Sequence, residues 1–462
     1  MNKLQQCPLI LTALFSVLIF TSCTSGSLEG NNREYSLIEL TQDLETLETA
    51  LRKNHSGLYW YQDKSAFDRR LKQTREALVE IEDLLQYYRL LNRLIATIGC
   101  GHTRLRLPVN RRNQLLDTMK TLPFRLAVSD GNFVVTGNNS DYKIPLGAKV
   151  ISFNDQKSEV ILNLIREHIS SDGYNTTGKD YQISRAGAMY IPSFLDRYIE
   201  RITVKFIPPG TDEIITETVE LNEVSQNGAL TDEPLLSLRY FDQKTAIMTI
   251  KTFAGGYLNK NGFDYYKFLD TSFLSIRTKP MDNLIIDLRG NGGGNDGYGS
   301  KLLSYLATSR FPYYRSIEVT EHYQGWGDIE NKDNRFYVTA HDDLGIHDIE
   351  KNRFNGDIYI LIDGGSFSAT SEFAAMAQHL GLAVFIGEET GGGACGNTSG
   401  ASKSVTLPNT GIVINIPQWK YRVANPPDTP CGRGVIPQIK VVDLPYTETD
   451  EALDVALELI GN

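Results

Sequence analysis

From about residue 235 onward, short apolar runs alternate with longer runs of helical period, and this alternation constrains the fold more than any other feature of the chain. The strand-like runs are Ala246 to Ile250, Asn283 to Leu288, Asp357 to Ile362 and Ala383 to Ile386, and the helical runs between them include Tyr298 to Ala307 and Glu372 to Leu380. Strands separated by helices favour a parallel sheet with helices packed on it. The sequence therefore predicts an α/β core over residues 235–445.

The chain ahead of this core predicts further domains, because 462 residues exceed what one hydrophobic core usually holds. Leucines at helical spacing follow Ser36, so residues 36–107 are expected to form a helical region. Residues 120–225 contain short strand-like runs, with Ser170 to Tyr198 as an added insertion. Pro145-Leu146-Gly147 leads into one of these runs and resembles the peptide-binding loop of a PDZ domain, which adds a peptide as an extra strand. A generic small β domain is the alternative.

The first residues indicate an export signal. The apolar stretch Pro8 to Phe20 is too short to span a membrane and is followed by Thr21-Ser22-Cys23. This pattern resembles a bacterial lipoprotein signal, with residues 1–22 removed, a lipid attached to Cys23 and residues 23–35 acting as a tether. An ordinary signal peptide is the alternative. We therefore expect a membrane-anchored protein of the bacterial cell envelope, at the inner or the outer membrane.

Composition and cysteine usage exclude several classes of partner. The formal net charge is −10 and no basic run is present, so nucleic acid is not an expected partner. The cysteines and seven histidines show no zinc-binding spacing, so we expect neither a metal nor another cofactor. A Cys395–Cys431 disulfide can form in an oxidising compartment, but the sequence alone does not establish it.

A cluster of serines between a strand-like and a helical run is the first candidate for chemistry. Gly364 to Glu372 reads Gly-Gly-Ser-Phe-Ser-Ala-Thr-Ser-Glu. Its hydroxyls are expected near a helix N-terminus, where free backbone N–H groups favour negative charge. This environment suits a nucleophilic serine and a tetrahedral oxyanion. The alternative is that these hydroxyls only cap the helix.

Two other glycine-containing turns offer partners for such a serine. Gly290 to Asn295 follows a strand-like run, and its glycine spacing fits a dinucleotide-binding fingerprint poorly. Bare N–H groups in a turn of this kind can instead bind an oxyanion. His102, between Gly101 and Thr103, has a side chain suited to proton transfer near neutral pH, although an isolated histidine is more often a surface residue.

In their order and separation, these three motifs resemble the tail-specific (C-terminal processing) serine protease family. The resemblance covers most of the mature chain, including Gly434 to Pro437. It implies a crotonase-like (ClpP-like) α/β spiral for the core and serine-dependent hydrolysis of peptides or unfolded protein segments. The family pattern Ser-x-Ser-Ala-x-Ser-Glu makes Ser368 the nucleophile, with Ser366 and Ser371 as supporting hydroxyls. By the same resemblance, the oxyanion hole uses backbone N–H groups of Gly292, Gly293 and Ala369.

The general base separates two branches of this family. The bacterial tail-processing branch uses a lysine after a Gly-Glu-x-Thr motif, but Gly391 to Cys395 contains none and Lys403 is the nearest. The tricorn-like branch takes a histidine from the Gly-His-Thr motif, which is His102 in this chain. That branch also orients its histidine with a serine and a late glutamate. Here Gly101 precedes the histidine, and Asp428 is the nearest late carboxylate.

The leading hypothesis is a lipid-anchored serine endopeptidase of the tricorn-like branch. The first alternative is a peptide-binding protein on the same fold with a weak or inactive site. The second is a protease that uses Lys403 as its base, and the third is an acyl hydrolase acting on non-peptide substrates. Residues 315–354 are rich in His, Asp and Asn and are expected to form a surface excursion beside the core.

Overall fold

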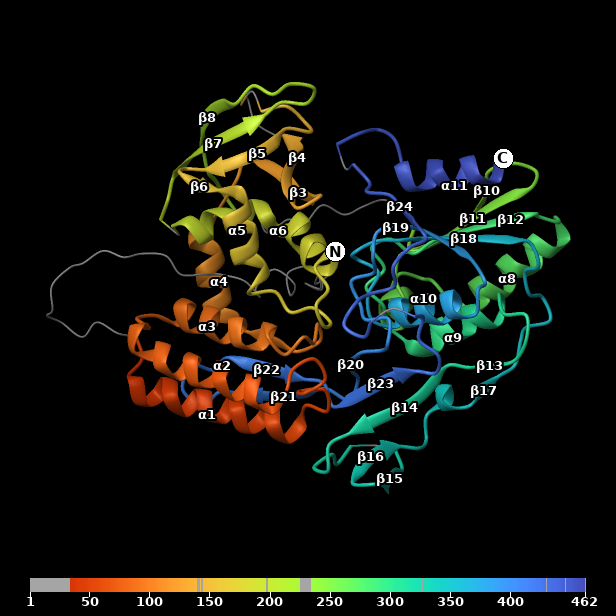
Figure 1. Ribbon diagram of the computed structural model, residues 1–462, viewed down its shortest axis with the longest axis horizontal. Helices are drawn as coiled ribbons and strands as arrows, with labels where there is room; N and C mark the ends of the chain where they lie inside the picture. The colour runs from red at the N-terminus through yellow and green to blue at the C-terminus, as the bar shows by residue number, and fades with distance from the viewer. Residues whose placement is uncertain are drawn as a thin grey trace, which may run out of the picture.

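A computed structural model of the chain describes residues 34–138, 142, 144–196, 198–224, 234–325, 327–428, 430–444 and 446–461. The expected signal sequence, Cys23 and nearly all of the tether lie outside these residues. Within the described ranges, no helix combines the length and the apolar character needed to cross a membrane. Figure 1 shows an N-terminal unit of helices and strands beside a C-terminal α/β core.

The N-terminal unit begins with a group of helices. The first helix begins after Ser36, where the leucine pattern predicts a helical region. Ser36 forms a capping box with Glu39 at its N-terminus. The helices are α1 (Leu37–Asn54), α2 (Lys64–Ala77), α3 (Leu84–Ala96) and α4 (Val109–Thr118), with the short strand β1 (Arg104–Arg106) between the last two. The leucines at helical spacing are buried in one hydrophobic core.

The same core extends into an antiparallel sheet with two helices. The sheet has the order β3 (Phe124–Ser129), β4 (Asn132–Asn138), β5 (Lys149–Phe153), β7 (Arg201–Ile207) and β8 (Ile215–Glu220). The remaining elements are β2 (Lys120–Thr121), β6 (Gln156–Lys157), β9 (Asn222–Glu223), α5 (Ser158–Arg166) and α6 (Thr177–Leu195). The segment expected to be an added insertion instead forms α6, whose buried side chains belong to the shared core.

Strand β5 follows the Pro145-Leu146-Gly147 turn, where the sequence suggests a peptide-binding edge. It pairs with β7 on one side and with β4 and β6 on the other. A strand with both edges occupied cannot receive a peptide as a further strand. The expected groove therefore does not lie at β5, because the chain itself fills both sides.

The C-terminal core contains the predicted α/β arrangement. Its six-stranded sheet has the order β10 (Leu236–Tyr240), β11 (Thr245–Ile250), β12 (Asn283–Asp287), β18 (Asp357–Ile362), β19 (Val384–Gly387) and β24 (Ile439–Lys440). All neighbours from β11 onward are parallel, and β10 is antiparallel.

Helices cover both faces of this sheet (Figure 1). One face packs against α7 (Gly255–Lys260), α8 (Tyr265–Thr278), α9 (Asp296–Ser304) and α10 (Ala369–His379). The other face packs against α11 (Glu451–Gly461), whose Ala452 and Ala456 contact the sheet through a separate apolar cluster. The carboxyl ends of β12 and β18 lead into α9 and α10, so the turns at these ends lie close together.

Residues 315–354 are only partly the surface excursion that the sequence suggests. A second sheet has the order β15 (Ile329–Lys332), β16 (Arg335–Val338), β14 (Tyr314–Val319), β23 (Trp419–Val423) and β20 (Thr398–Ser399). The short strands β13 (Phe311–Pro312) and β17 (Ile346–His347) pair nearby. Tyr314 and Ile317 of β14 are buried in the core, so this half of the segment is structural.

A hairpin from the C-terminal part of the chain joins the two units. Strands β21 (Lys403–Thr406) and β22 (Val413–Ile416) form a hairpin, and β22 pairs with β1. Asp43 of α1 accepts hydrogen bonds from the backbone N–H groups of Asn409 (2.8 Å) and Thr410 (2.9 Å) in the hairpin turn. These contacts fix the position of the loop before β1, which carries His102.

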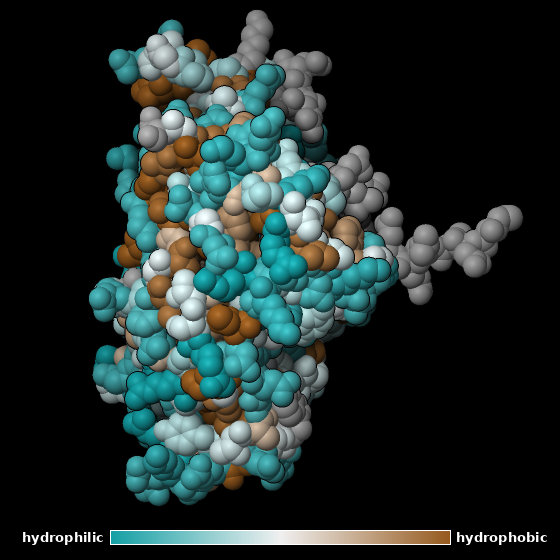
Figure 2. All heavy atoms as spheres, turned by 90° about the vertical axis from the view of Figure 1, so that its right-hand side faces the viewer, coloured by the Kyte–Doolittle hydropathy of each residue, from teal (hydrophilic) through white to brown (hydrophobic). Residues whose placement is uncertain are grey.

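The outer face of the core is mostly polar. Figure 2 shows hydrophilic side chains over much of this face, with hydrophobic side chains gathered in smaller groups and along one edge. This pattern is ordinary for a water-exposed face, since folded proteins always leave some apolar surface uncovered.

Candidate active site

Ser368 occupies a strained turn between β18 and α10. Its backbone has φ 57° and ψ −129°, a conformation that residues with a side chain rarely adopt. Its side chain does not cap the helix. Its Oγ instead lies 3.0 Å from Nε2 of His102. Strain of this kind gathers at functional sites, and the capping alternative does not describe this serine.

The neighbouring serines brace the turn. Ser366 Oγ donates to the carbonyl of Leu288 (2.9 Å), and Ser371 Oγ donates to the carbonyl of Ser366 (2.8 Å). Both serines are buried. These contacts join the serine turn to the end of β12 and place both hydroxyls in hydrogen bonds to backbone carbonyls.

Asp363 links the serine turn to the glycine loop. Its Oδ1 accepts hydrogen bonds from the N–H groups of Gly290 (2.8 Å), Gly365 (2.9 Å) and Ser366 (3.0 Å). Burial raises the pKa of this carboxyl, and the N–H groups of Gly290 and Gly365 oppose that shift. A single side chain therefore sets the spacing of the two turns that follow β12 and β18.

The glycine loop approaches the serine more closely than any side chain would permit. Gly293 has φ +85°, and a Cβ there would lie 2.6 Å from the carbonyl oxygen of Phe367 and 2.8 Å from Cβ of Ser368. The N–H of Gly293 donates to Oδ1 of Asn291 (3.0 Å). Among the hydrogen bonds of the described residues, the N–H groups of Gly292 and Ala369 have no acceptor. The N–H groups of Gly292 and Ala369 are therefore available to a ligand, whereas the N–H of Gly293 is already used.

His102 lies in the loop between α3 and β1 and stacks on Phe367. The two ring centroids are 4.7 Å apart with an interplanar angle of 28°. A Cβ at Gly101 would lie 2.7 Å from Cζ of Phe367, so the ring fills the space that a serine at this position would need. Burial lowers the pKa of His102 to about 3, and the charge of Arg104 contributes to the shift. His102 is therefore neutral and able to accept a proton.

A buried carboxylate, Asp172, lies beside His102. It accepts hydrogen bonds from the N–H groups of Gly101 (2.9 Å) and Gly393 (3.2 Å). One of its oxygens lies within 4.8 Å of a ring nitrogen of His102 and of Sγ of Cys100. In the described part of the chain, the buried Nδ1 of His102 has no hydrogen-bond partner. Burial raises the pKa of Asp172 to about 6, against the opposing effect of the two N–H groups.

Reasoning from the sequence missed Asp172. It lies 71 residues from Gly101, in the segment interpreted as an insertion. The only local signal is the turn-forming run Ser170-Ser171-Asp172-Gly173, which by itself indicates a loop. The carboxylate suggested in its place, Asp428, is exposed on the surface.

Lys403 does not take part in this cluster. It is exposed on β21, where it pairs with Ile416 in the hairpin. No hydrogen bond described for the chain joins it to Ser368. The structure thus brings together Ser368, Ser366, Ser371, His102 and the glycine loop, and leaves Lys403 and Asp428 outside.

Among the described residues, two groups of side chains have the composition of metal ligands. One is Cys100, His102 and Asp172, and the other is Asp296, His341 and Asp343. Hydrogen bonds occupy several of these atoms. Nε2 of His102 faces Ser368, and Sγ of Cys100 donates to the carbonyl of Thr398 (3.3 Å). Nδ1 of His341 accepts the N–H of Asp343 (3.2 Å), which places its proton on Nε2, 3.3 Å from Asp296. Both groups are explained as hydrogen-bonded clusters.

Cys395 and Cys431 form a disulfide close to the site. Cys395 belongs to the Gly391 to Cys395 loop, in which the N–H of Gly392 donates to the carbonyl of Ser366 (3.2 Å). The disulfide that the sequence left open therefore supports a loop touching both Asp172 and the serine turn. Cys100 is a free, buried cysteine whose pKa burial raises to about 12.

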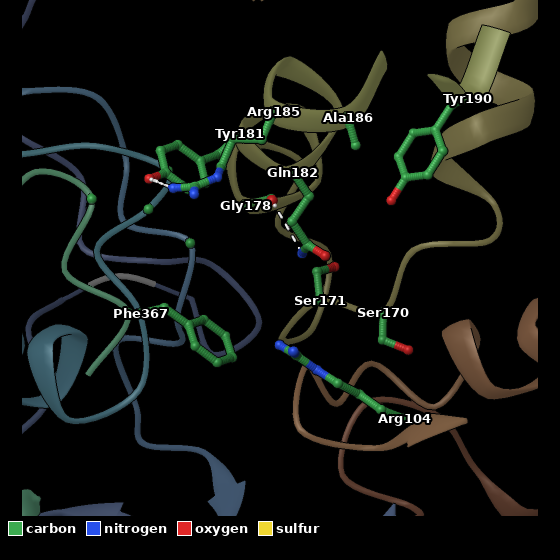
Figure 3. Close-up of a pocket in the computed structure, with 15 residues that line it drawn as sticks. Arg104, Ser170, Ser171, Gly178, Tyr181, Gln182, Arg185, Ala186, Tyr190 and Phe367 are labelled. Atoms are coloured by element: carbon green, nitrogen blue, oxygen red, sulfur yellow. Dashed lines mark hydrogen bonds between the residues drawn. The ribbon is translucent and has the colours of Figure 1, made fainter. Parts of the chain in front are cut away.

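A cavity of about 370 Å³ opens beside the glycine loop (Figure 3). Gly292 and Phe367 contribute from the core, and Arg104, Tyr181 and Gln182 from the N-terminal unit. Gly292, which bears one of the available N–H groups, and Phe367, whose ring stacks on His102, thus border a space large enough for a substrate side chain.

Comparisons with known proteins found a family match for the core and a similar fold for most of the chain. Residues 244–441 match the model of peptidase family S41. The structure of mature CPAF matches with a TM-score of 0.64 and 15% identity, covering 92% of this chain and 97% of that one. Mature CPAF complexed with lactacystin matches with a TM-score of 0.62 and 14% identity over the same shares of the two chains. No curated protein sequence matches.

The similarity to CPAF, at such low identity, concerns the fold. It extends over both units of the chain, whereas the family match covers only the C-terminal α/β core. The mixed α/β architecture, with N-terminal helices and β-rich sheets, is that of this protease fold. The C-terminal core, residues 244–441, is similar to serine-type peptidases of family S41, and the chain as a whole has the fold of these peptidases.

Proposed function

We propose that the protein is a serine endopeptidase with Ser368 as nucleophile and His102 as general base. The observation that carries this proposal is the 3.0 Å distance between Ser368 Oγ and His102 Nε2. The two residues are 266 positions apart and come from different units of the molecule. Such a contact, at a strained turn next to the glycine loop, has the geometry of a nucleophile with its base.

The reaction follows from these positions. Nε2 of His102 removes the proton from Ser368 Oγ while the oxygen attacks the carbonyl carbon of the substrate. The resulting oxyanion accepts hydrogen bonds from the N–H groups of Gly292 and Ala369. His102 then gives its proton to the leaving amine, which yields an acyl-enzyme. Water, deprotonated by His102, attacks the acyl-enzyme, and Ser368 regains its proton as the acid product leaves.

Asp172 completes this proposal as the positioning carboxylate. During the reaction His102 becomes a cation held largely away from water, which burial alone strongly disfavours. A carboxylate within 4.8 Å stabilises that cation, and its bond to the Gly101 N–H holds the loop that carries the histidine. Asp172 thus takes the place of the late glutamate implied by the family resemblance.

We also propose that the enzyme works in the bacterial cell envelope, anchored through a lipid on Cys23. The support is the signal-like sequence before Cys23 and the Cys395–Cys431 disulfide. Disulfides persist mainly in oxidising compartments outside the cytoplasm. Metabolic labelling with a fatty-acid analogue, compared between the wild type and Cys23→Ala, tests the anchor. Equal labelling of the two would contradict it.

Activity-based labelling tests the mechanism. The wild type should react with a serine-directed fluorophosphonate and hydrolyse unfolded protein substrates, and Ser368→Ala should do neither. His102→Ala should lose most labelling, because Oγ then lacks a proton acceptor. Lys403→Ala is the matched control and should behave as the wild type. Equal labelling of wild type and Ser368→Ala would exclude Ser368, and a folded but inert wild type would favour a peptide-binding role.

A further inference from the structure

The cavity next to the proposed nucleophile contains an arginine that none of the preceding steps uses. Arg104 begins β1, two residues after His102, and its guanidinium points into the cavity between Phe367 and Ser171 (Figure 3). Its Nε donates to the carbonyl of Gly101 (3.0 Å), which fixes the direction of the side chain. The two terminal nitrogens are left facing the cavity.

In the part of the chain that the structure describes, no carboxylate forms a hydrogen bond or an ion pair with Arg104, and the charge of the nearby Asp172 only partly offsets the effect of burial on it. Asp172 is the nearby acid, and its two oxygens are directed to the N–H groups of Gly101 and Gly393. Burial lowers the pKa of Arg104, which reflects the cost of holding this charge away from water. A half-buried guanidinium whose terminal nitrogens bind no carboxylate is stabilised when a ligand supplies the opposite charge.

The other charged side chain in the cavity wall is also positive. Arg185 of α6 also borders it and donates to the hydroxyl of Tyr181 (3.1 Å). None of the cavity-lining residues is an aspartate or a glutamate. This positive pocket stands out in a chain whose formal net charge is −10. Ser171 and Gln182 add groups that can donate hydrogen bonds to an anion.

We propose that this cavity binds a carboxylate of the substrate through Arg104, so that the peptidase favours an acidic side chain beside the bond it cleaves. The inference rests on the proposed function, because the cavity is a substrate site only if Ser368 is the nucleophile. Gly292, which offers a free N–H to the oxyanion, and Phe367, which precedes the nucleophile, both line the cavity. A side chain next to the attacked carbonyl can therefore enter it. A planar guanidinium can bind such a carboxylate through two parallel hydrogen bonds.

Peptides blocked at both ends, with Glu, Gln, Leu or Lys at a single variable position next to the cleaved bond, test the proposal. The wild type should cleave the Glu peptide with a kcat/KM about 10- to 100-fold above that of the Gln peptide, the range expected for a charge-assisted pair. Arg104→Gln should bring this ratio close to 1, and Arg104→Lys should keep part of it. The ratio cancels any general loss of activity caused by a change so near His102.

Arg185→Gln is the matched control, because Arg185 borders the same cavity but is exposed. It should change the Glu/Gln ratio much less than Arg104→Gln does. A second pair of peptides, with a free or an amidated C-terminus, identifies the source of the carboxylate. If only the free C-terminus is preferred, and this preference depends on Arg104, the cavity binds the C-terminal carboxylate of the peptide and not an acidic side chain.

Binding to Ser368→Ala tests the cavity without catalysis. This variant should bind the Glu peptide more tightly than the Gln peptide, and Arg104→Gln added to it should remove the difference. Equal cleavage and equal binding of all peptides, with fluorophosphonate labelling of the wild type intact, would overturn the carboxylate site alone. Loss of the labelling difference between wild type and Ser368→Ala would instead overturn the proposed function.

Discussion

In the proposed mechanism, the chemistry at Ser368 depends on a histidine that burial keeps neutral. His102 has its pKa lowered to about 3, so its lone pair remains available far below neutral pH. The same burial makes the imidazolium intermediate costly, because little water solvates it. The nearby carboxylate of Asp172 therefore sets how well the base works, and its own pKa, raised to about 6, falls within the working range.

Because the pKa of Asp172 lies above that of His102, the fall of activity at acid pH should follow the protonation of Asp172. Above a pH of about 6 the carboxylate is charged and stabilises His102 as a cation. As the pH falls through this value Asp172 takes up a proton, so kcat/KM should decline although His102 is still neutral. Asp172→Asn should lower kcat on the order of 10²-fold and abolish this decline. Rate measurements from about pH 4.5 to about pH 8 check it.

Asp428→Asn serves as the control, since Asp428 is exposed and should leave the pH profile unaltered. Asn at position 172 can still accept one N–H, so melting curves should show that the variant folds. An Asp172→Asn profile parallel to that of the wild type would reduce Asp172 to a structural role.

Individual residues of the site were predictable only where a motif contains them. Ser368 and His102 stand in recognisable patterns, and the structure brings them into contact. Asp172 stands in no such pattern, because its proximity to Gly101 arises from the fold. The glycine before His102, an apparent departure from the family, is explained by the ring of Phe367. The local sequence does not predict contacts between segments that are distant in the chain.

At the scale of elements, the loop after β12 must approach the loop after β18 closely. Gly293 permits this approach, whereas Gly292 faces open space, with no atom within 4 Å of the place where a Cβ would lie. Gly293→Ala should push the loop away from Ser368 and cost on the order of 10²- to 10³-fold in kcat, as the loss of an oxyanion donor does. Gly292→Ala keeps its N–H and should cost far less. Steady-state kinetics on both variants check the difference.

Thermal melts should accompany these measurements, because Gly293 has a positive φ and an alanine there adds strain. A folded Gly293→Ala enzyme with wild-type kcat would show that the close contact between the loops does not matter for the oxyanion. Equal losses in the two variants would mean that the N–H of Gly292 is not presented as proposed.

The sequence pattern predicts a helix or strand correctly where the residues that stabilise the element lie close to it in the chain. The run Asp357 to Ile362, which the sequence predicts as a strand, is a strand with those same ends. The pattern fails for β14, which pairs with β23 about a hundred residues later. Polar residues after β14 suggested a surface loop, but the strand is fixed by a distant partner that periodicity does not reveal.

At the scale of the whole molecule, the proposed nucleophile and its proposed base come from two units with largely separate hydrophobic cores. The distance between Ser368 and His102 therefore depends on the contacts that join the units. One is the hairpin turn on Asp43, and another is the loop of Gly391 to Cys395, whose Gly393 N–H donates to Asp172. Loosening either contact should affect catalysis before it unfolds the core.

The Cys395–Cys431 disulfide secures the second of these contacts. It closes a loop across 36 residues, for which chain entropy gives about 4 kcal/mol of stabilisation, and measured values commonly reach about 2–4 kcal/mol. Reduction should therefore lower the unfolding midpoint of the wild type and, by freeing the loop that contacts Asp172, reduce kcat. The double variant Cys395→Ala/Cys431→Ala should show both changes without reductant and no response to it. Denaturant titrations and rates with and without dithiothreitol check this, and an identical midpoint and kcat in the two conditions would mean that the disulfide supports neither the fold nor the site.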